Sequence, residues 1–230
     1  MSSYRFTEQK AVSLRHRIAD DIRRAILEGK LKPGDRLLEL EMSKQMGVSR
    51  GPIREALRVL EQEGLLHSQP FKETVVAEFS TEEVVHVLIP IRLTVETYAL
   101  RKALPLFGEQ DFAYLEQCLQ GMRESGEKND VAKLVENDLA FHEYIVVKSQ
   151  VVNLMNIWSS IYTRIRMHFY MQDQKYEDIT KVWEQHQPLL DTMRTGNVEL
   201  ACAELSRHIY DTNLLSLGLP VRKPESGTPQ

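Results

Sequence analysis

Apolar residues recur at three- and four-residue spacing near the start of the chain and predict three helices there. The first spans residues 14–28 and the second about residues 39–46. The third begins after Ser49, a residue type that suits a helix N-cap, and ends before Gly64. The apolar stripe of the first helix contains Leu14, Ile18, Ile22, Ile26 and Leu27, and that of the third contains Ile53, Ala56, Leu57 and Leu60.

Two short strands follow the third helix. We expect them at 65–67 and 74–77, on either side of a turn at 69–72. A helix, a helix–turn–helix and a hairpin, in this order, are typical of a winged helix-turn-helix. The sequence therefore predicts a DNA-binding domain over residues 1–78.

The rest of the chain has a helical pattern throughout. Ser80 and Glu83 form a capping box that opens a long helix to about Leu104, and Pro90 should kink it. Further helices are expected at about 109–125, 130–149, 152–172, 175–195 and 197–217. We predict a mostly α fold, in which the winged helix-turn-helix precedes an all-α bundle of about six helices over residues 79–218. Residues 219–230 should form a disordered polar tail.

Composition and charge narrow the class of protein. The 230 residues contain no apolar run long enough for a membrane span and no secretory signal pattern, so we expect no membrane partner. Two cysteines and this lack of a signal favour a reducing, cytoplasmic setting. Nucleotide-binding glycine motifs are absent from the sequence. Residues 1–78 carry a net charge of +2 and the remainder −6, which weakly favours contact between the first domain and a polyanion.

The third helix carries the candidate DNA contacts. Arg50 and Arg54 lie one turn apart at its N-terminal end, where side chains of a recognition helix reach base edges. Arginine bonds guanine O6 and N7 in the major groove, and Ser49, the Gly51 backbone and Arg36 are placed to hold phosphates. The alternative is a solvated surface helix whose arginines pair with Glu55 and Glu61.

Four residues of the helical body form a candidate metal site. Asp138 and His142 share one face of a helix, while His186 and His208 lie on two later helices beside leucine and isoleucine residues. One carboxylate and three imidazoles in a bundle core suit a divalent transition metal, with zinc expected first and nickel or manganese as alternatives. The competing interpretation is a set of hydrogen-bonded core histidines.

The first domain resembles the GntR superfamily of bacterial transcription regulators. The resemblance rests on P-G-x-x-L at residues 33–37 and on G-V-S-R-x-P-I-R-E-A-L-x-x-L-x-x-E-G-L at residues 47–65. It implies a homodimer on a palindromic DNA operator, with DNA contacts at Arg36, Ser49, Arg50, Gly51 and Arg54. The wing has no glycine near its tip, where the family usually has one, but Lys72 is placed to touch DNA there.

The body resembles the FCD ligand-binding domain of the FadR subfamily. The matching motifs are R-x-x-x-E at 92–96, D-x-x-x-H at 138–142, E-x-H at 184–186 and a final A-x-x-x-x-x-x-H at 201–208. They imply metal ligands at Asp138, His142, His186 and His208, and a small organic-acid effector held by Arg92, with Arg164 or Arg166 as alternatives. One departure is Gln150-Val151-Val152, where the family often has a Gly-Asn-Pro break.

These patterns favour a ligand-responsive transcription regulator without enzymatic activity. We expect a repressor, although the sequence leaves the direction of regulation open. One alternative is a metallohydrolase, which is disfavoured because only one acid accompanies the histidines and no nucleophile motif such as GxSxG occurs. The other is a winged-helix protein whose histidines are purely structural.

Overall fold

The protein is described here by a computed structural model covering residues 14–27, 29–68, 73–78, 80–172 and 179–219. The chain divides into two compact units, residues 1–77 and 78–230. The candidate wing-tip residue Lys72 and residues 220–230 of the expected tail lie outside the described residues. Among the described helices, none combines the length and apolar character that a membrane span requires.

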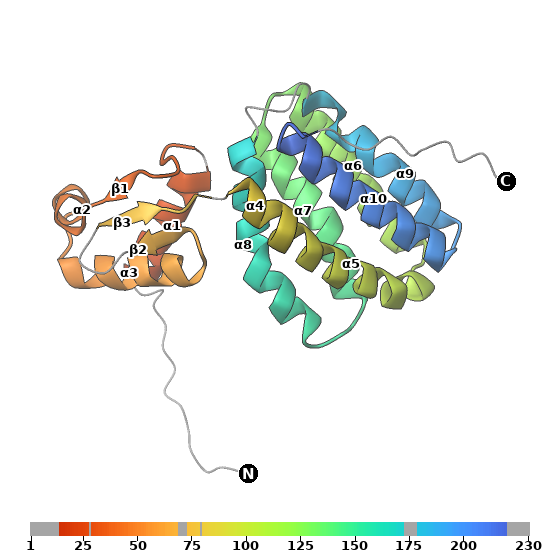
Figure 1. The fold of residues 1–230 in the computed structure, drawn as a ribbon, viewed down its shortest axis with the longest axis horizontal. Helices are drawn as coiled ribbons and strands as arrows, with labels where there is room; N and C mark the ends of the chain where they lie inside the picture. Colours follow the sequence, from red (N-terminus) through yellow and green to blue (C-terminus); the bar gives the residue numbers. More distant parts are fainter. Residues whose placement is uncertain (1–13, 28, 69–72, 79, 173–178, 220–230) are drawn as a thin grey trace, which may run out of the picture. The chain divides into compact units, whose positions relative to one another are not determined.

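The first unit has the element order expected of a winged helix-turn-helix. Its elements are α1 (Leu14–Leu27), β1 (Arg36–Leu37), α2 (Glu39–Met46), α3 (Arg50–Gln62), β2 (Leu66–Ser68) and β3 (Thr74–Val76) (Figure 1). Helices α1 and α3 pack together through their apolar stripes, so that Ile18, Ile22, Ile53 and Leu60 are buried. Leu14, at the start of α1, is 41% exposed, so this end of the predicted stripe is not buried.

A three-stranded antiparallel sheet completes this unit, with the strand order β1-β3-β2. Arg36 lies opposite Val75, and Leu66 lies opposite Val76. Strand β1 was not predicted, because its two residues are too few to show an alternating pattern. It places Arg36 at one edge of the sheet.

The described part of the second unit is helical. They are α4 (Thr81–Glu83), a π-helical turn (Val84–Leu88), α5 (Ile89–Ala103), a 3-10 turn (Leu104–Leu106), α6 (Glu109–Glu127), α7 (Val131–Lys148), α8 (Leu154–Gln172), a second 3-10 turn (Ile179–Lys181), α9 (Val182–Arg194) and α10 (Val198–Ser216). Each neighbouring pair around the ring α5–α7–α6–α9–α10 is in contact, and α10 returns to α5 (Figure 1). Helix α8 packs on α7 and α5. The predicted mostly α architecture, a winged helix-turn-helix followed by a bundle, is confirmed.

Pro90 changes the first helix of the bundle in a way that the sequence pattern did not specify. The predicted helix from Ser80 to Leu104 is divided by the π-helical turn, in which the Ile89 amide donates to the Val84 carbonyl. Proline has no N–H and its ring collides with the carbonyl four residues earlier, so an α-helical turn is unfavourable at this point. The wider π turn accommodates the ring, and α5 then continues with Pro90 in its first turn.

The end of α7 is formed without a glycine. Gln150 adopts a left-handed conformation with φ of 56° and donates its amide to the Val147 carbonyl. A left-handed residue ends a helix by turning the chain out of its axis, and glycine is the residue that does so with least strain. The break before α8 therefore has the usual backbone form despite its unusual sequence.

Candidate metal centre and nucleic-acid interface

The two arginines at the start of α3 lie on its solvent face. The side chains of Arg50 and Arg54 are 55% and 53% exposed, whereas Ile53 and Leu57 on the opposite face are buried. The alternative of a solvated surface helix predicted that these arginines pair with Glu55 and Glu61, but neither of them does. Both pair instead with Glu39, the first residue of α2.

Ser49 and Gly51 surround the N-terminus of the same helix. Ser49 is the N-cap residue, but its side chain makes no capping hydrogen bond, and both residues are exposed. The first amides of a helix lack partners within the helix and attract anions. Arg36 lies outside α3, on β1, where its guanidinium is 2.9 Å from the Glu73 carboxylate. The described candidates for DNA contact are therefore exposed, and the arginines among them are held by carboxylates.

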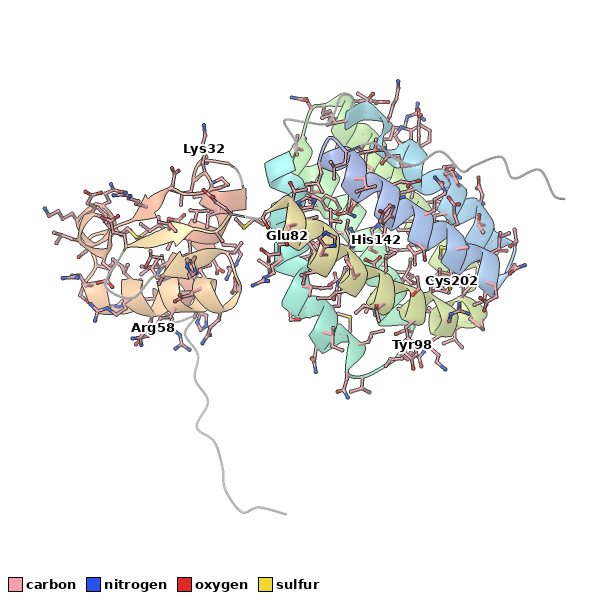
Figure 2. All side chains as sticks on the ribbon, in the orientation of Figure 1. Lys32, Arg58, Glu82, Tyr98, His142 and Cys202 are labelled. Atoms are coloured by element: carbon pink, nitrogen blue, oxygen red, sulfur yellow. The ribbon has the colours of Figure 1, made fainter. Side chains whose placement is uncertain are left out.

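Three buried imidazoles meet inside the helical unit. His142 comes from α7, His186 from α9 and His208 from α10, and each is at most 3% exposed. One nitrogen of each ring lies within 4.8 Å of those of the other two. Figure 2 labels His142 within the outline of the helical unit, and its exposed fraction of 1% places it in the interior. The structure thus brings together residues that are 66 positions apart in the sequence.

The other nitrogen of each ring is already engaged. The Nδ1 atom of His186 lies 3.1 Å from the Val182 carbonyl, and that of His208 lies 3.1 Å from the Gln185 carbonyl. A carbonyl only accepts hydrogen bonds, so the proton of each neutral ring is assigned to Nδ1. The Nδ1 atom of His142 is 2.6 Å from Glu96 Oε2, which assigns its proton in the same way. The Nε2 atoms of His142 and His208 therefore present lone pairs, and that of His186 does so when its ring is neutral, which is the form of histidine that binds metals.

Among the described residues, these lone pairs have no satisfactory partner. The Nε2 atoms of His142 and His208 face each other at 3.3 Å, where two lone pairs repel unless a cation lies beside them. His186 Nε2 is 3.0 Å from Asp138 Oδ1 but has no hydrogen-bond partner of normal geometry. Asp138 Oδ2 is also buried and unpaired. Unpaired acceptors in one buried cluster fit the donor set of a divalent transition metal.

Arg92 compensates part of the negative charge of this cluster. Its Nε atom is 2.7 Å from Glu96 Oε1, and both side chains are buried. Burial raises the pKa of the Glu96 carboxyl, but Arg92 and His142 outweigh this effect and lower it overall. Asp138 follows the same rule: burial raises its pKa, whereas His186, His142 and Arg92 lower it. Both carboxylates are thus held in the charged form.

His208 shows the opposite effect of burial. Desolvation lowers the pKa of its imidazole well below the usual value, and His186, His142 and Arg92 add to this shift. A neutral imidazole keeps its Nε2 lone pair at neutral pH. The environment therefore prepares this ring to act as a ligand.

The structure brings Arg92 to the histidine cluster but leaves Arg164 outside it. Arg92 Nη2 is buried without a hydrogen-bond partner, so it is available to an anion. Arg164 is 44% exposed and its guanidinium pairs with Glu83. This pairing also explains why the expected capping box is half formed, because Ser80 accepts from the Glu83 amide while the Glu83 carboxylate is turned to Arg164. Arg166 pairs with Glu136.

Sequence reasoning missed the residues that hold the imidazoles. Glu96 entered the sequence analysis only as the last residue of the R-x-x-x-E motif, yet one of its oxygens accepts from Arg92 and the other holds His142. The signal was the R-x-x-x-E spacing, which places both side chains on one helical face. The carbonyls of Val182 and Gln185 could not be found from the sequence, because a backbone acceptor leaves no mark on residue type.

Two comparisons with known families decide the identity of the chain. Residues 14–76 match the family described as bacterial regulatory proteins, gntR family, and residues 87–211 match the FCD domain. The chain belongs to the GntR family of regulators and carries an FCD domain. This GntR-family regulator is 24% identical over 201 residues to the gluconate operon transcriptional repressor of Bacillus subtilis (strain 168), covering 85% of its own length and 82% of the relative.

A second relative of this GntR-family regulator has a solved structure. The HTH-type transcriptional regulator McbR of Escherichia coli (strain K12) is 24% identical over 212 residues, which cover 91% of this chain and 95% of the relative. The solved structure of E. coli McbR/YncC covers 90% of this chain and 99% of its own, with a TM-score of 0.73 and 22% identity. At this identity the structural likeness supports the shared fold. The metallohydrolase alternative is not favoured, because these relatives are transcription regulators.

Proposed function

We propose that this chain is a metal-dependent, ligand-responsive repressor that acts in the cytoplasm as a homodimer on a palindromic operator. Asp138, His142, His186 and His208 would hold a divalent transition metal, zinc first among the candidates. The observation that carries the metal assignment is the buried cluster of three imidazoles, each with one nitrogen within 4.8 Å of the others, beside an unpaired Asp138 oxygen. Repression is proposed by analogy with the gluconate operon repressor.

The effector we propose is a small organic acid. A bound metal supplies a Lewis acid that attracts a carboxylate oxygen. The Arg92 guanidinium supplies a nearby positive charge and an unpaired Nη2 donor. Arg164, which pairs with Glu83 on the surface, is not included in the proposed effector site.

The packing around this site gives a physical route to regulation. A cavity of about 20 Å³ lies between α7 and α9 and is lined by Asp138 and by six apolar side chains, among them Phe169. The ring of Phe169 is also 5.5 Å from the Arg92 guanidinium. This volume holds about one water molecule. An organic acid must therefore displace side chains on entry, which couples its binding to the packing of the bundle.

At the other unit, we propose that Arg50 and Arg54 contact base edges. Arg36, Ser49 and the Gly51 backbone would contact phosphates. Lys72 is added from the family pattern alone, because it lies outside the described residues. The effector would change operator affinity only as far as it binds the two states of the dimer differently.

The experiment that tests the metal assignment compares purified wild type with His142→Ala, His186→Ala and His208→Ala. We expect bound metal in the wild type by elemental analysis and a sharp loss in each variant. His86→Ala is the matched control, because His86 is exposed on the π-helical turn of the same unit. Full metal content in the three variants, or none in wild type supplied with zinc, nickel or manganese, would favour structural histidines.

The regulatory part needs a separate measurement. Operator fragments are selected from random DNA with the full-length protein, and their affinity is then measured with and without small organic acids. We expect one class of acid to change the affinity in the metal-loaded protein and not after chelation. Equal affinity under all conditions would contradict the proposed coupling.

A further inference from the structure

Glu39 makes four contacts with the two arginines of the recognition helix. Arg50 reaches Glu39 Oε2 with Nε at 3.2 Å and Nη2 at 2.8 Å. Arg54 reaches Oε1 with Nε at 2.9 Å and Oε2 with Nη2 at 2.9 Å. One carboxylate on α2 therefore binds both side chains that are proposed to contact bases.

The contacts use the same edge of both guanidinium groups. Each arginine turns its Nε–Nη2 edge to Glu39, and no contact with Glu39 uses Nη1. The end of the group, formed by Nη1 and the outer hydrogen of Nη2, is left for another acceptor. A planar guanidinium can bond two acceptors at once through different edges, and guanine O6 and N7 accept from such a pair of hydrogens.

The ion pairs between Glu39 and the two arginines contribute too little to the free energy of folding to explain why they form. Both arginines are more than half exposed, and exposed ion pairs contribute little to folding. Glu39 is less exposed, at 24%, and belongs to the first turn of α2, where the helix dipole favours a carboxylate. Arg54 and Arg50 together lower the pKa of Glu39 to about 2, so its charge is present throughout the neutral range.

The contacts instead restrict two long side chains before DNA arrives. A free arginine loses rotamer freedom when it binds a base, and preorganisation reduces that loss. Because α2 packs on α3, the carboxylate has a defined position relative to the recognition helix.

We propose that Glu39 is a positioning residue that sets base specificity by holding Arg50 and Arg54 with their free ends toward the DNA. This inference rests on the proposed DNA-binding role of the two arginines. It predicts that Glu39 acts on discrimination between sequences more than on total affinity for DNA. A carboxylate that merely competes with DNA phosphates for the arginines would instead change the affinity for all DNA sequences and leave the discrimination between them unchanged.

The test begins with the full-length wild-type protein and a randomised DNA library, from which an operator is selected. Dissociation constants of wild type and Glu39→Gln are then measured on this operator, on its single-base variants and on an unrelated duplex, at several salt concentrations. Glutamine preserves the shape of the side chain but removes the charge that binds two guanidinium groups. Circular dichroism and thermal unfolding verify that the variant is folded.

We expect Glu39→Gln to weaken operator binding by about tenfold or more, which corresponds to losing one good base contact. Binding to the unrelated duplex should be unchanged or tighter, because a negative charge has been removed. The loss of discrimination should be confined to the bases that Arg50→Ala and Arg54→Ala also affect. In the background of both alanine substitutions, Glu39→Gln should cause no further loss of specificity.

Glu41→Gln is the matched control, because Glu41 lies on the same helix, is exposed and has no ion pair among the described residues. It should change operator and unrelated duplex binding by the same factor. If Glu39→Gln behaves like this control, with all base preferences retained, the carboxylate only competes with DNA and the inference is overturned. If the wild type selects no operator, the proposed function itself is wrong and the inference falls with it.

Discussion

The substitution Glu96→Gln tests whether the carboxylate behind His142 supports both the fold and the metal site. Glu96 is fully buried and accepts two hydrogen bonds, from Arg92 Nε at 2.7 Å and from His142 Nδ1 at 2.6 Å. Glutamine has the same shape but only one accepting oxygen, and its amide group is a donor. One of the two N–H groups would then face another donor.

Two magnitudes follow from this geometry. Removing one partner of a buried ion pair costs about 3–5 kcal/mol, and the remaining negative charge of Asp138 places our expectation at the lower end of that range. For the metal, loss of the group that orients a histidine ligand lowers affinity about 10–100-fold. The variant should thus unfold at a lower urea concentration and bind zinc more weakly.

The two effects are measured separately. Urea unfolding of the metal-free proteins gives the change in stability, and competition with a chromophoric chelator gives the zinc dissociation constant. Glu199→Gln is the matched control, because Glu199 pairs with Arg101 on the surface between α10 and α5 and should change neither quantity measurably. A folded Glu96→Gln protein with wild-type zinc affinity would refute the idea that Glu96 prepares His142 as a ligand.

Three further substitutions test single features of the helical unit. Burial raises the pKa of Asp111, but Lys148, Tyr144 and the Gly108 amide outweigh it and lower the pKa to about 2. The carboxylate therefore stabilises the fold above its ordinary pKa near 3.8, and this contribution is lost as the pH falls toward 2. In Asp111→Asn, urea unfolding between pH 2 and 5 should depend less steeply on pH, and an unchanged slope would argue against this role. Gln150→Gly should raise the unfolding free energy by about 0.5–1 kcal/mol, because glycine adopts the left-handed conformation of this exposed position without strain. A lower unfolding free energy would show that contacts of the glutamine side chain stabilise the fold by more than the backbone strain destabilises it. Ser80→Ala should lower the unfolding free energy by about 1 kcal/mol through loss of the N-cap bond to the Glu83 amide, and denaturant titration without a measurable change would contradict it.

Periodicity predicted the long helices but not all of their limits, because the helix expected at about 175–195 begins as an α-helix only at Val182, after a 3-10 turn. The apolar stripe of α3 fixed both the helix and the direction of its polar face, because burial of Ile53 and Leu57 leaves Arg50 and Arg54 on the solvent side. Irregular features escaped the same reasoning. A π turn has no residue pattern of its own, and Pro90 indicated only that some distortion was required.

The convergence of the histidines had a different basis. Helical spacing relates Asp138 to His142, but only the tertiary fold relates either of them to His186 and His208. The likeness to the FCD domain supplied that relation at the sequence level. Residue spacing could not reveal that the arginines of α3 pair with Glu39. That pairing depends on the packing of α2 on α3, which brings Glu39 close to both side chains.

Two of the three imidazoles are held by main-chain carbonyls of one helix, at Val182 and Gln185 of α9. The hydrogen bonds to the rings therefore do not depend on the side chains at these two positions, although packing still limits the buried Val182. An inserted or deleted residue between 182 and 186 has a different effect, because it rotates the Val182 carbonyl by about 100° relative to His186 and breaks the four-residue spacing between them. Among homologues that keep the histidines, the length of this stretch should therefore vary less than the side chain at position 185.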